Sequence, residues 1–245
     1  MNNRVWICGM GAISAIGDTV LENFESLVAG NSGVGKSTFL HTIHKDSLLV
    51  CEIKKSNEEL AGMAKMKPYL PRAAYFSAIA CEEAMTEFKQ QIGEAAYKKL
   101  RVGFLSGNTI GGMDLSEHFY DDFLRDKSSG HLSDVVYHEC GAITELVAEK
   151  LNINRYVATL STACSSSANA IMQGCRLIKH NKLDVVIAGG TDALCRFTLN
   201  GFNTLMIVDS EPCKPFDDNR KGLNLGEGAG YIVLVSDAIK DALPI

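Results

Sequence analysis

Residues 157–179 read VATLSTACSSSANAIMQGCRLIK, and the hydrophobic pattern changes within this stretch from that of a strand to that of a helix. The apolar, β-branched run at 157–160 is typical of a buried strand. From Ser166 onward, apolar residues recur at helical spacing. Small hydroxyl residues separate the two patterns, with Cys164 among them. The stretch therefore predicts a strand that runs directly into a helix, with Cys164 on the connecting turn.

The predicted position of Cys164 favours reactivity. The start of a helix carries the positive end of the helix dipole, which stabilises a thiolate relative to a thiol. A thiolate is the form that acts as a nucleophile, and the Cys164 N–H at the helix start could donate to an oxyanion. The alternative is a small buried thiol, the common state of an isolated cysteine. The turn position and the small neighbours favour the nucleophile.

Outward from this stretch, short apolar runs alternate with helical patterns. We expect strands at 4–8, 102–106, 157–161, 183–188 and 231–236, with a short one at 48–53. We expect helices at 19–29, 73–87, 93–99, 141–150 and 166–180, with some helix in 113–137. Apart from the short strand, residues 31–70 read as irregular and charged. This alternation predicts an α/β fold, with a mixed, mostly parallel sheet covered by helices on both faces.

Composition excludes several classes of protein. The chain has 245 residues, 46% of them hydrophobic and only five of them proline, which indicates a compact fold. The net charge of −5 gives no reason to expect nucleic acid or an anionic membrane as the partner. The N-terminus lacks a basic segment and is interrupted by glycines, so no signal peptide or membrane span is expected. The cytoplasm is the expected compartment.

Cysteine and histidine spacing gives no sign of a metal site. The eight cysteines, at 8, 51, 81, 140, 164, 175, 195 and 213, include no C-x-x-C pair. We therefore expect neither disulfides nor a metal. The six histidines, at 41, 44, 118, 131, 138 and 180, lie outside glycine-rich loops and are expected to be surface or packing residues.

One motif is misleading. Residues 30–37, GNSGVGKS, match the P-loop pattern that binds nucleotide phosphates. That motif requires a strand before the loop and a helix after it, whereas LENFESLVAG before it has helical spacing and ends at a glycine. We expect a surface turn here, with Lys36 in no phosphate site.

The segment TACSSSANAI at 162–171 closely resembles the active-site segment of the β-ketoacyl-acyl carrier protein synthases, of the thiolase-like superfamily. Four further blocks resemble segments of this family, in the same order along the chain. They are VWICGMGAISAIG at 5–17, GNTIGGM at 107–113, VVIAGGTDAL at 185–194 and PFDDNRKGLNLGEGAGYIVL at 215–234. The resemblance covers nearly the whole chain, so it implies that residues 1–245 are the N-terminal half of a thiolase-like fold.

The resemblance also implies a reaction. Cys164 would receive an acyl group from the phosphopantetheine arm of an acyl carrier protein and hold it as a thioester. A malonyl thioester would then lose CO₂, and the resulting carbanion would attack the acyl group. The chain would need no cofactor of its own. Its implied partners are the carrier protein and a second ketosynthase-like subunit, in a homodimer or heterodimer.

The chain departs from the family in one respect. Family members carry two catalytic histidines, a lysine and a second oxyanion donor in a C-terminal half that this sequence does not contain. Either the chain is part of a longer synthase, or a partner chain supplies these groups. The alternative function is a catalytically incomplete half-enzyme that dimerises or binds carrier protein.

Secondary sites follow from the resemblance. Thr109, Gly111, Met113 and Phe202 fall in segments that resemble the surroundings of the acyl pocket. As ordinary residues they would form a turn and part of the core.

Charged residues give two further predictions. Lys65, Lys67 and Arg72 form a small basic cluster in a region that resembles the carrier-docking surface, and they could equally be a solvated face. We expect Asp192 and Glu227 to be structural acids that brace glycine turns.

Overall fold

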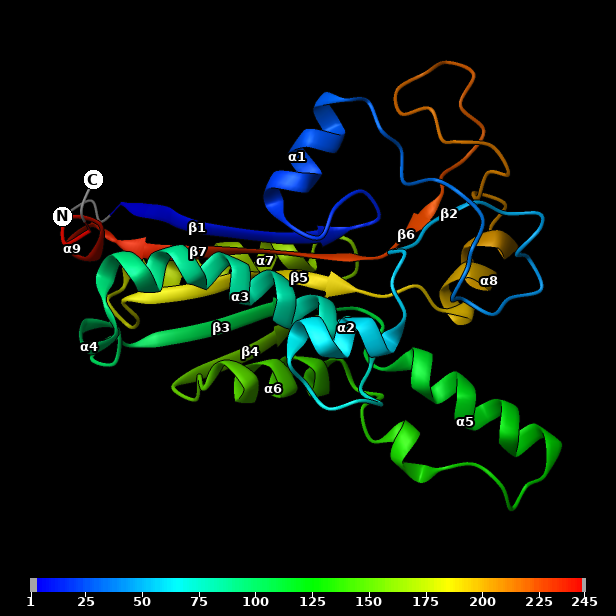
Figure 1. Cartoon of the computed structure of the whole chain (residues 1–245), viewed down its shortest axis with the longest axis horizontal. Helices are drawn as coiled ribbons and strands as arrows, with labels where there is room; N and C mark the ends of the chain where they lie inside the picture. The colour runs from blue at the N-terminus through cyan, green and yellow to red at the C-terminus, as the bar shows by residue number, and fades with distance from the viewer. Residues whose placement is uncertain (1–3, 244–245) are drawn as a thin grey trace.

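The computed structural model describes residues 4–243 and contains one central five-stranded sheet (Figure 1). The strand order is β1-β7-β5-β3-β4. The strands are β1 (Val5–Ser14), β3 (Val102–Gly107), β4 (Tyr156–Leu160), β5 (Val185–Asp192) and β7 (Gly228–Ser236). β3 pairs in parallel with β4 and β5, whereas β7 pairs antiparallel with β5 and β1. Four strands therefore run one way and β7 the other, which confirms the mixed, mostly parallel sheet.

Helices cover both faces of the sheet. α3 (Arg72–Ile92) and α6 (Cys140–Leu151) pack on one face, and α7 (Ser166–Lys179) packs on the other (Figure 1). The larger hydrophobic cluster lies under α3, and a smaller one lies under α7. The predicted α/β class is therefore confirmed.

β1 is longer than the sequence suggested. The strand was predicted to end at residue 8, but β1 continues to Ser14, and Gly9 and Gly11 lie inside it. A Cβ on Gly11 would stand 1.9 Å from the carbonyl oxygen of Ala80. The glycines therefore allow α3 to lie directly on β1, and this close approach could not be predicted from the local sequence pattern.

The helix predicted at 19–29 is present as α1 (Val20–Val28), and the Thr19 side chain accepts from the Glu22 N–H. Its apolar residues are not buried. Leu21, Phe24 and Leu27 are each more than 60% exposed. α1 contributes an apolar surface rather than core packing.

The remaining elements lie outside the central sheet. They are β2 (Val50–Cys51), α2 (Asn57–Ala64), α4 (Glu94–Tyr97), α5 (Met113–Arg125), the 3₁₀ helix η1 (Leu132–Val135), α8 (Arg196–Thr204), β6 (Leu225–Gly226) and α9 (Asp237–Lys240). The prediction of an irregular segment was wrong at α2. The reciprocal hydrogen bonds of Ser56 and Glu59 form a capping box there, which the S-x-x-E spacing signals.

Residues 30–37 do not adopt P-loop geometry. They follow α1 rather than a strand, and no helix begins within or directly after them. Lys36 Nζ lies 3.2 Å from Asp46 Oδ1 on the surface. The prediction of a turn was wrong, because residues 31–37 are extended and Gly35 forms an antiparallel bridge with Val50. Separately, no helix among residues 4–243 is long and apolar enough to span a membrane.

Candidate active site

Cys164 lies on the turn between β4 and α7, as the sequence predicts, and its side chain is exposed. The preceding residue, Ala163, has φ of +54°. A non-glycine residue in this left-handed region is uncommon and indicates a backbone held by its surroundings. The turn presents the thiol outward at the carboxyl end of the strand.

Hydrogen bonds around the thiol hold this turn. The Ser166 hydroxyl accepts from the Thr162 N–H at 2.9 Å and donates to the Ala163 carbonyl at 2.6 Å. Asn169 Nδ2 donates to the Thr162 hydroxyl at 2.8 Å. Backbone N–H and C=O groups in this sharp turn have no partners in the strand or the helix, and these local polar side chains bind them instead.

Glycines on the neighbouring strands bring α7 close to the sheet. A Cβ on Gly107 would stand 2.6 Å from the Ser167 nitrogen, and one on Gly190 would stand 2.1 Å from the Ser167 hydroxyl. Gly107 pairs with Leu160 on one side and with Gly190 on the other. The carboxyl ends of β3, β4 and β5 therefore meet beneath the start of α7.

A cavity of about 310 Å³ opens beside the thiol. Its lining includes Cys164 and Ser167, with one carboxylate, that of Asp192. Most of the remaining lining comes from glycine and alanine backbone. A lining of this kind leaves space for a group attached to the sulfur.

The other seven cysteines differ from Cys164 in exposure. Cys81 and Cys195 are buried, and the remaining five are partly buried. Burial raises the pKa of five of these thiols, those of Cys8, Cys51, Cys81, Cys175 and Cys195. A raised pKa lowers the thiolate fraction, so the exposed thiol at Cys164 is the best placed to react.

None of the six histidines, all of which the structure describes, lines the Cys164 cavity. His138 is an example, since its Nδ1 lies 3.0 Å from the Ser116 hydroxyl in a contact that serves the turn before α6. Within residues 4–243, the cavity therefore has no imidazole to act as an acid or base.

The predicted acyl-pocket residues are only partly brought together. Thr109 hydrogen-bonds to Asp192, which lines the Cys164 cavity, but Thr109 itself is not part of the lining. Gly111 is buried with φ of +58°, so its role is to shape the turn. Met113 lines a separate cavity of about 1150 Å³ with Phe197, and Phe202 lies on α8 outside the Cys164 cavity.

The basic cluster requires a correction. Lys65 and Lys67 are exposed, but Arg72 is only 6% exposed and faces inward. Its guanidinium donates to Glu227 at 2.9–3.1 Å, and it also donates to the Ile53 carbonyl at 2.7 Å. Arg72 is therefore excluded from a docking surface, because its charge is already paired in the interior.

The two acids predicted to brace turns do so. Glu227 also accepts from the N–H groups of Ile53 and Leu194, at 3.0 and 3.1 Å. Asp192 accepts from the N–H groups of Thr109 and Ile110.

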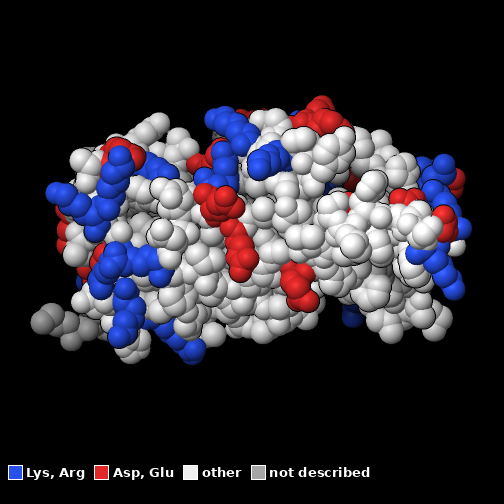
Figure 2. All heavy atoms as spheres, turned by 90° about the horizontal axis from the view of Figure 1, so that it is seen from below, with Lys and Arg blue, Asp and Glu red and all other residues white. Residues whose placement is uncertain are grey.

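A second group of basic residues was not predicted. Figure 2 shows Lys and Arg gathered at the end of the molecule that carries α4 and α9. The chain segments that lead into β3, β4 and β5 place Lys98, Lys99, Arg155 and Lys182 on the surface there. Because Cys164 follows the opposite ends of these strands, a carrier docked on this group would not face the thiol.

The sequence and fold match a known family. The chain belongs to the β-ketoacyl synthase family, because the family's N-terminal domain matches residues 2–238. It is 29% identical over 246 residues to 3-oxoacyl-(acyl-carrier-protein) synthase 2 of Staphylococcus aureus strain COL, with 96% of this chain covered. It is 30% identical over 242 residues to nodulation protein E of Rhizobium meliloti strain 1021, again with 96% covered.

Solved structures agree with this assignment. The ishigamide ketosynthase/chain length factor structure covers 100% of this chain with a TM-score of 0.88 and 25% identity. The ketosynthase ApeO in complex with its chain length factor ApeC, from Xenorhabdus doucetiae, covers 95% with a TM-score of 0.75 and 26% identity. The chain spans 58% of the length of both curated relatives and 62% and 58% of these two structures.

Proposed function

We propose that this chain is the acyl-accepting part of a β-ketoacyl-acyl carrier protein synthase, with Cys164 as the nucleophile, in fatty acid or polyketide chain extension. The exposed thiol on the turn between β4 and α7 carries the proposal. Membership of the synthase family supports the reaction type.

In the first step the Cys164 thiolate attacks the carbonyl carbon of an acyl thioester. The carbon–sulfur bond to the phosphopantetheine arm breaks, and the released thiolate takes up a proton. The Cys164 N–H is one donor to the oxyanion formed on the way.

In the second step a malonyl thioester loses CO₂, and the resulting carbanion attacks the Cys164-bound acyl carbonyl. The β-ketoacyl product leaves on the carrier arm, and the Cys164 thiolate is restored. We propose that the histidines, lysine and second oxyanion donor implied by the family resemblance come from outside residues 1–245, either from a C-terminal half or from a partner chain.

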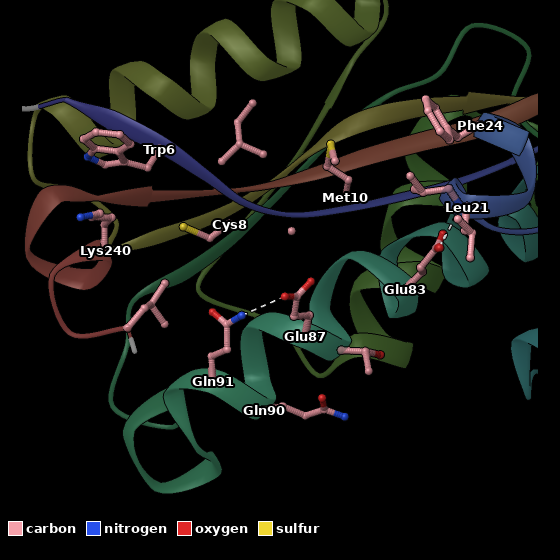
Figure 3. A pocket seen from close by; sticks show the side chains of 15 residues that line it. Trp6, Cys8, Met10, Leu21, Phe24, Glu83, Glu87, Gln90, Gln91 and Lys240 are labelled. Atoms are coloured by element: carbon pink, nitrogen blue, oxygen red, sulfur yellow. Dashed lines mark hydrogen bonds between the residues drawn. The ribbon is translucent and has the colours of Figure 1, made fainter. Parts of the chain in front are cut away.

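A second candidate function is a half-enzyme that acts as a dimerisation or carrier-binding module. An apolar groove of about 1010 Å³ along the edge strand β1 favours it (Figure 3). Met10 on β1 and Phe24 on α1 lie on its apolar side, and Glu83 and Glu87 come from α3. Ile7 and Met10 are each 58% exposed. Exposed apolar residues gathered in this way are typical of an interaction surface.

We propose two partners. An acidic carrier protein would approach near Lys65 and Lys67, the exposed part of the predicted basic cluster. A second ketosynthase-like subunit would complete a homodimer or heterodimer, and two of the solved ketosynthases similar to this chain are named with a chain length factor.

Thiol labelling tests the catalytic proposal. A limiting amount of iodoacetamide, followed by peptide mass mapping, should modify Cys164 ahead of the other seven cysteines. Cys140 is a suitable internal control, because it is partly buried and its Sγ lies 4.0 Å from the Ser161 hydroxyl. Uniform labelling, or labelling of Cys140 first, would contradict an activated nucleophile.

Sedimentation velocity tests the interaction module. Phe24→Glu should reduce self-association or association with a ketosynthase-like partner, because it places a charge on the groove. Leu132→Glu, a substitution of a 73% exposed residue on η1, is the matched control. Equal association by both variants would exclude the groove as the contact surface.

A further inference from the structure

Two cysteines outside the Cys164 cavity meet at the small sheet formed by β2 and β6. Cys51 on β2 pairs with Gly226 on β6, and a Cβ on Gly226 would stand 3.1 Å from the Cys51 Cβ. Side chains two residues apart in extended backbone point to the same side, so Asn224 shares this face with Cys51. Asn224 Oδ1 in turn accepts from the Cys213 N–H at 2.8 Å. Asn224 therefore brings Cys213 to the face that carries the Cys51 thiol.

The electrostatics of the two thiols agree with this placement. Burial raises the pKa of the Cys51 thiol, and the negative charge of the Cys213 thiolate raises that pKa further, with Lys54 acting in the opposite direction. Exposed charges more than ~10 Å apart are largely screened from each other, so the two sulfurs are near neighbours. Both cysteines are free and partly buried.

The segment that carries Cys213 is an open loop before β6 (Figure 1). Every residue from 210 to 221 is exposed except Cys213, and Phe216 is 99% exposed. Asn224 Nδ2 holds the start of the loop by donating to the carbonyls of Asp209 and Glu211, each at 3.1 Å. Cys213 is thus the residue through which this loop could be fixed to the sheet.

We propose that Cys51 and Cys213 are a redox-sensitive pair, which forms a reversible disulfide that ties the 210–221 loop to β2. The pair is separate from the proposed reaction at Cys164 and does not depend on it. Because Gly226 pairs with Cys51 and also lines the Cys164 cavity, the bond would fix one wall of that cavity.

The oxidant is a small disulfide such as oxidised glutathione. The Cys213 thiolate attacks one of its sulfurs, the sulfur–sulfur bond breaks, and one glutathione thiolate leaves. The Cys51 thiolate then attacks the Cys213 sulfur and displaces the second glutathione. Two protein thiols are oxidised, and the two released glutathione thiolates take up the two protons. Cys213 reacts first, because its loop is exposed and Cys51 has a raised pKa.

Peptide mapping under non-reducing conditions tests the pair, after the full chain has been incubated with oxidised glutathione. We expect a linked Cys51–Cys213 peptide that dithiothreitol separates. Cys51→Ser should abolish the link and leave glutathione on Cys213, because the second step is lost. Cys213→Ser should leave Cys51 largely unmodified. Cys175→Ser is the matched control, since Cys175 is also partly buried with a raised pKa, and its loss should leave the link intact.

Limited proteolysis tests whether the bond holds the loop. Arg220 and Lys221 are exposed, and trypsin cleavage after them requires the loop to open locally. Oxidation should slow this cleavage several-fold in the wild-type chain. It should not slow cleavage in Cys51→Ser, in which Cys213 carries glutathione but no bond to β2.

Three outcomes would overturn the inference. In the first, other cysteines link in preference to Cys51 and Cys213. In the second, the Cys51–Cys213 link forms no faster in the folded chain than in the chain unfolded by urea. In the third, the link forms but cleavage of the loop is unchanged, which would mean that the bond does not hold the loop.

Discussion

The Arg72–Glu227 pair and the Cys164 turn lie at the same end of the sheet, yet they are built in opposite ways. Glu227 directly precedes β7, whose first residue pairs with Asp192 at the end of β5. Its carboxylate and the Arg72 guanidinium are buried and paired with each other and with backbone groups. At Cys164 the hydrogen bonds hold the neighbouring residues, and the thiol itself stays exposed.

Polar residues at one edge of the sheet therefore have different roles. A buried ion pair is tolerated only when both charges and the remaining donors are satisfied. An exposed nucleophile needs a rigid setting but must keep its reacting atom free. The hydrogen bonds of Arg72 stabilise the fold. The hydrogen bonds around Cys164 hold the backbone of its turn and so orient the thiol.

The largest effect is expected from Glu227→Gln. The substitution leaves the Arg72 guanidinium buried without its counter-charge, which should lower the free energy of unfolding by about 3–5 kcal/mol. Urea denaturation measures this change. Glu211→Gln, which removes an exposed partner of Lys221, is the control and should cost about 0–1 kcal/mol. Equal losses in the two variants would remove the contrast between a buried and an exposed pair.

Gly107→Ala tests the close approach beneath the thiol. Its new Cβ would meet the backbone of Ser166 and Ser167, so the start of α7 must shift. We expect a loss of about 1–3 kcal/mol in unfolding free energy, together with weaker selectivity of iodoacetamide for Cys164. Gly230→Ala is the control, because a Cβ there meets nothing within 4 Å. Unchanged labelling in Gly107→Ala would show that the thiol does not depend on this contact.

Asn169→Ala examines the polar network of the turn. It removes the donor to the Thr162 and Ser165 hydroxyls, at 2.8 and 3.3 Å, and should cost about 0.5–1.5 kcal/mol. Chemical denaturation is the measurement, and Asn200→Ala, on an exposed position of α8, is the control. If both variants unfold alike, the remaining hydrogen bonds of Ser166 are sufficient to hold the turn.

The smallest effect concerns acid stability at the opposite end of the sheet. Hydrogen bonding to the Arg101 guanidinium lowers the pKa of Asp184. The pair therefore stabilises the fold fully above the ordinary carboxyl pKa of about 4, and this contribution disappears as the pH falls through the lowered value. The difference in unfolding free energy between the wild-type chain and Asp184→Asn should shrink below about pH 4. A difference that does not vary with pH would contradict this assignment.

Local signals in the sequence predicted most of the regular elements. The strand, turn and helix around Cys164 follow from a change of hydrophobic period, and β3 and α6 follow in the same way. The capping box at Ser56 was also readable, although α2 was not predicted. The P-loop match at residues 30–37 was a false signal. The residues fit the motif, but the helix before them and the missing helix after them do not.

Contacts between distant residues could not be predicted. Arg72 looked like a surface charge, because its partner Glu227 lies 155 residues away along the chain. The exposure of Leu27 on α1 could not be predicted either, because an amphipathic pattern does not show what the apolar face of the helix packs against. The placement of Met113 in a cavity separate from that of Cys164 also depends on contacts between distant residues and could not be predicted.

Three features follow from the amino-acid sequence alone: the α/β class, the position of Cys164 on a strand-to-helix turn and the resemblance to the synthases. Each of these depends on residues close together in the chain. Other features depend on the three-dimensional packing: Arg72 is buried, Asp192 lines the same cavity as Cys164, and α1 and β1 leave an apolar groove open. Burial and proximity depend on how the strands order themselves in the sheet, and local periodicity carries no information on that order.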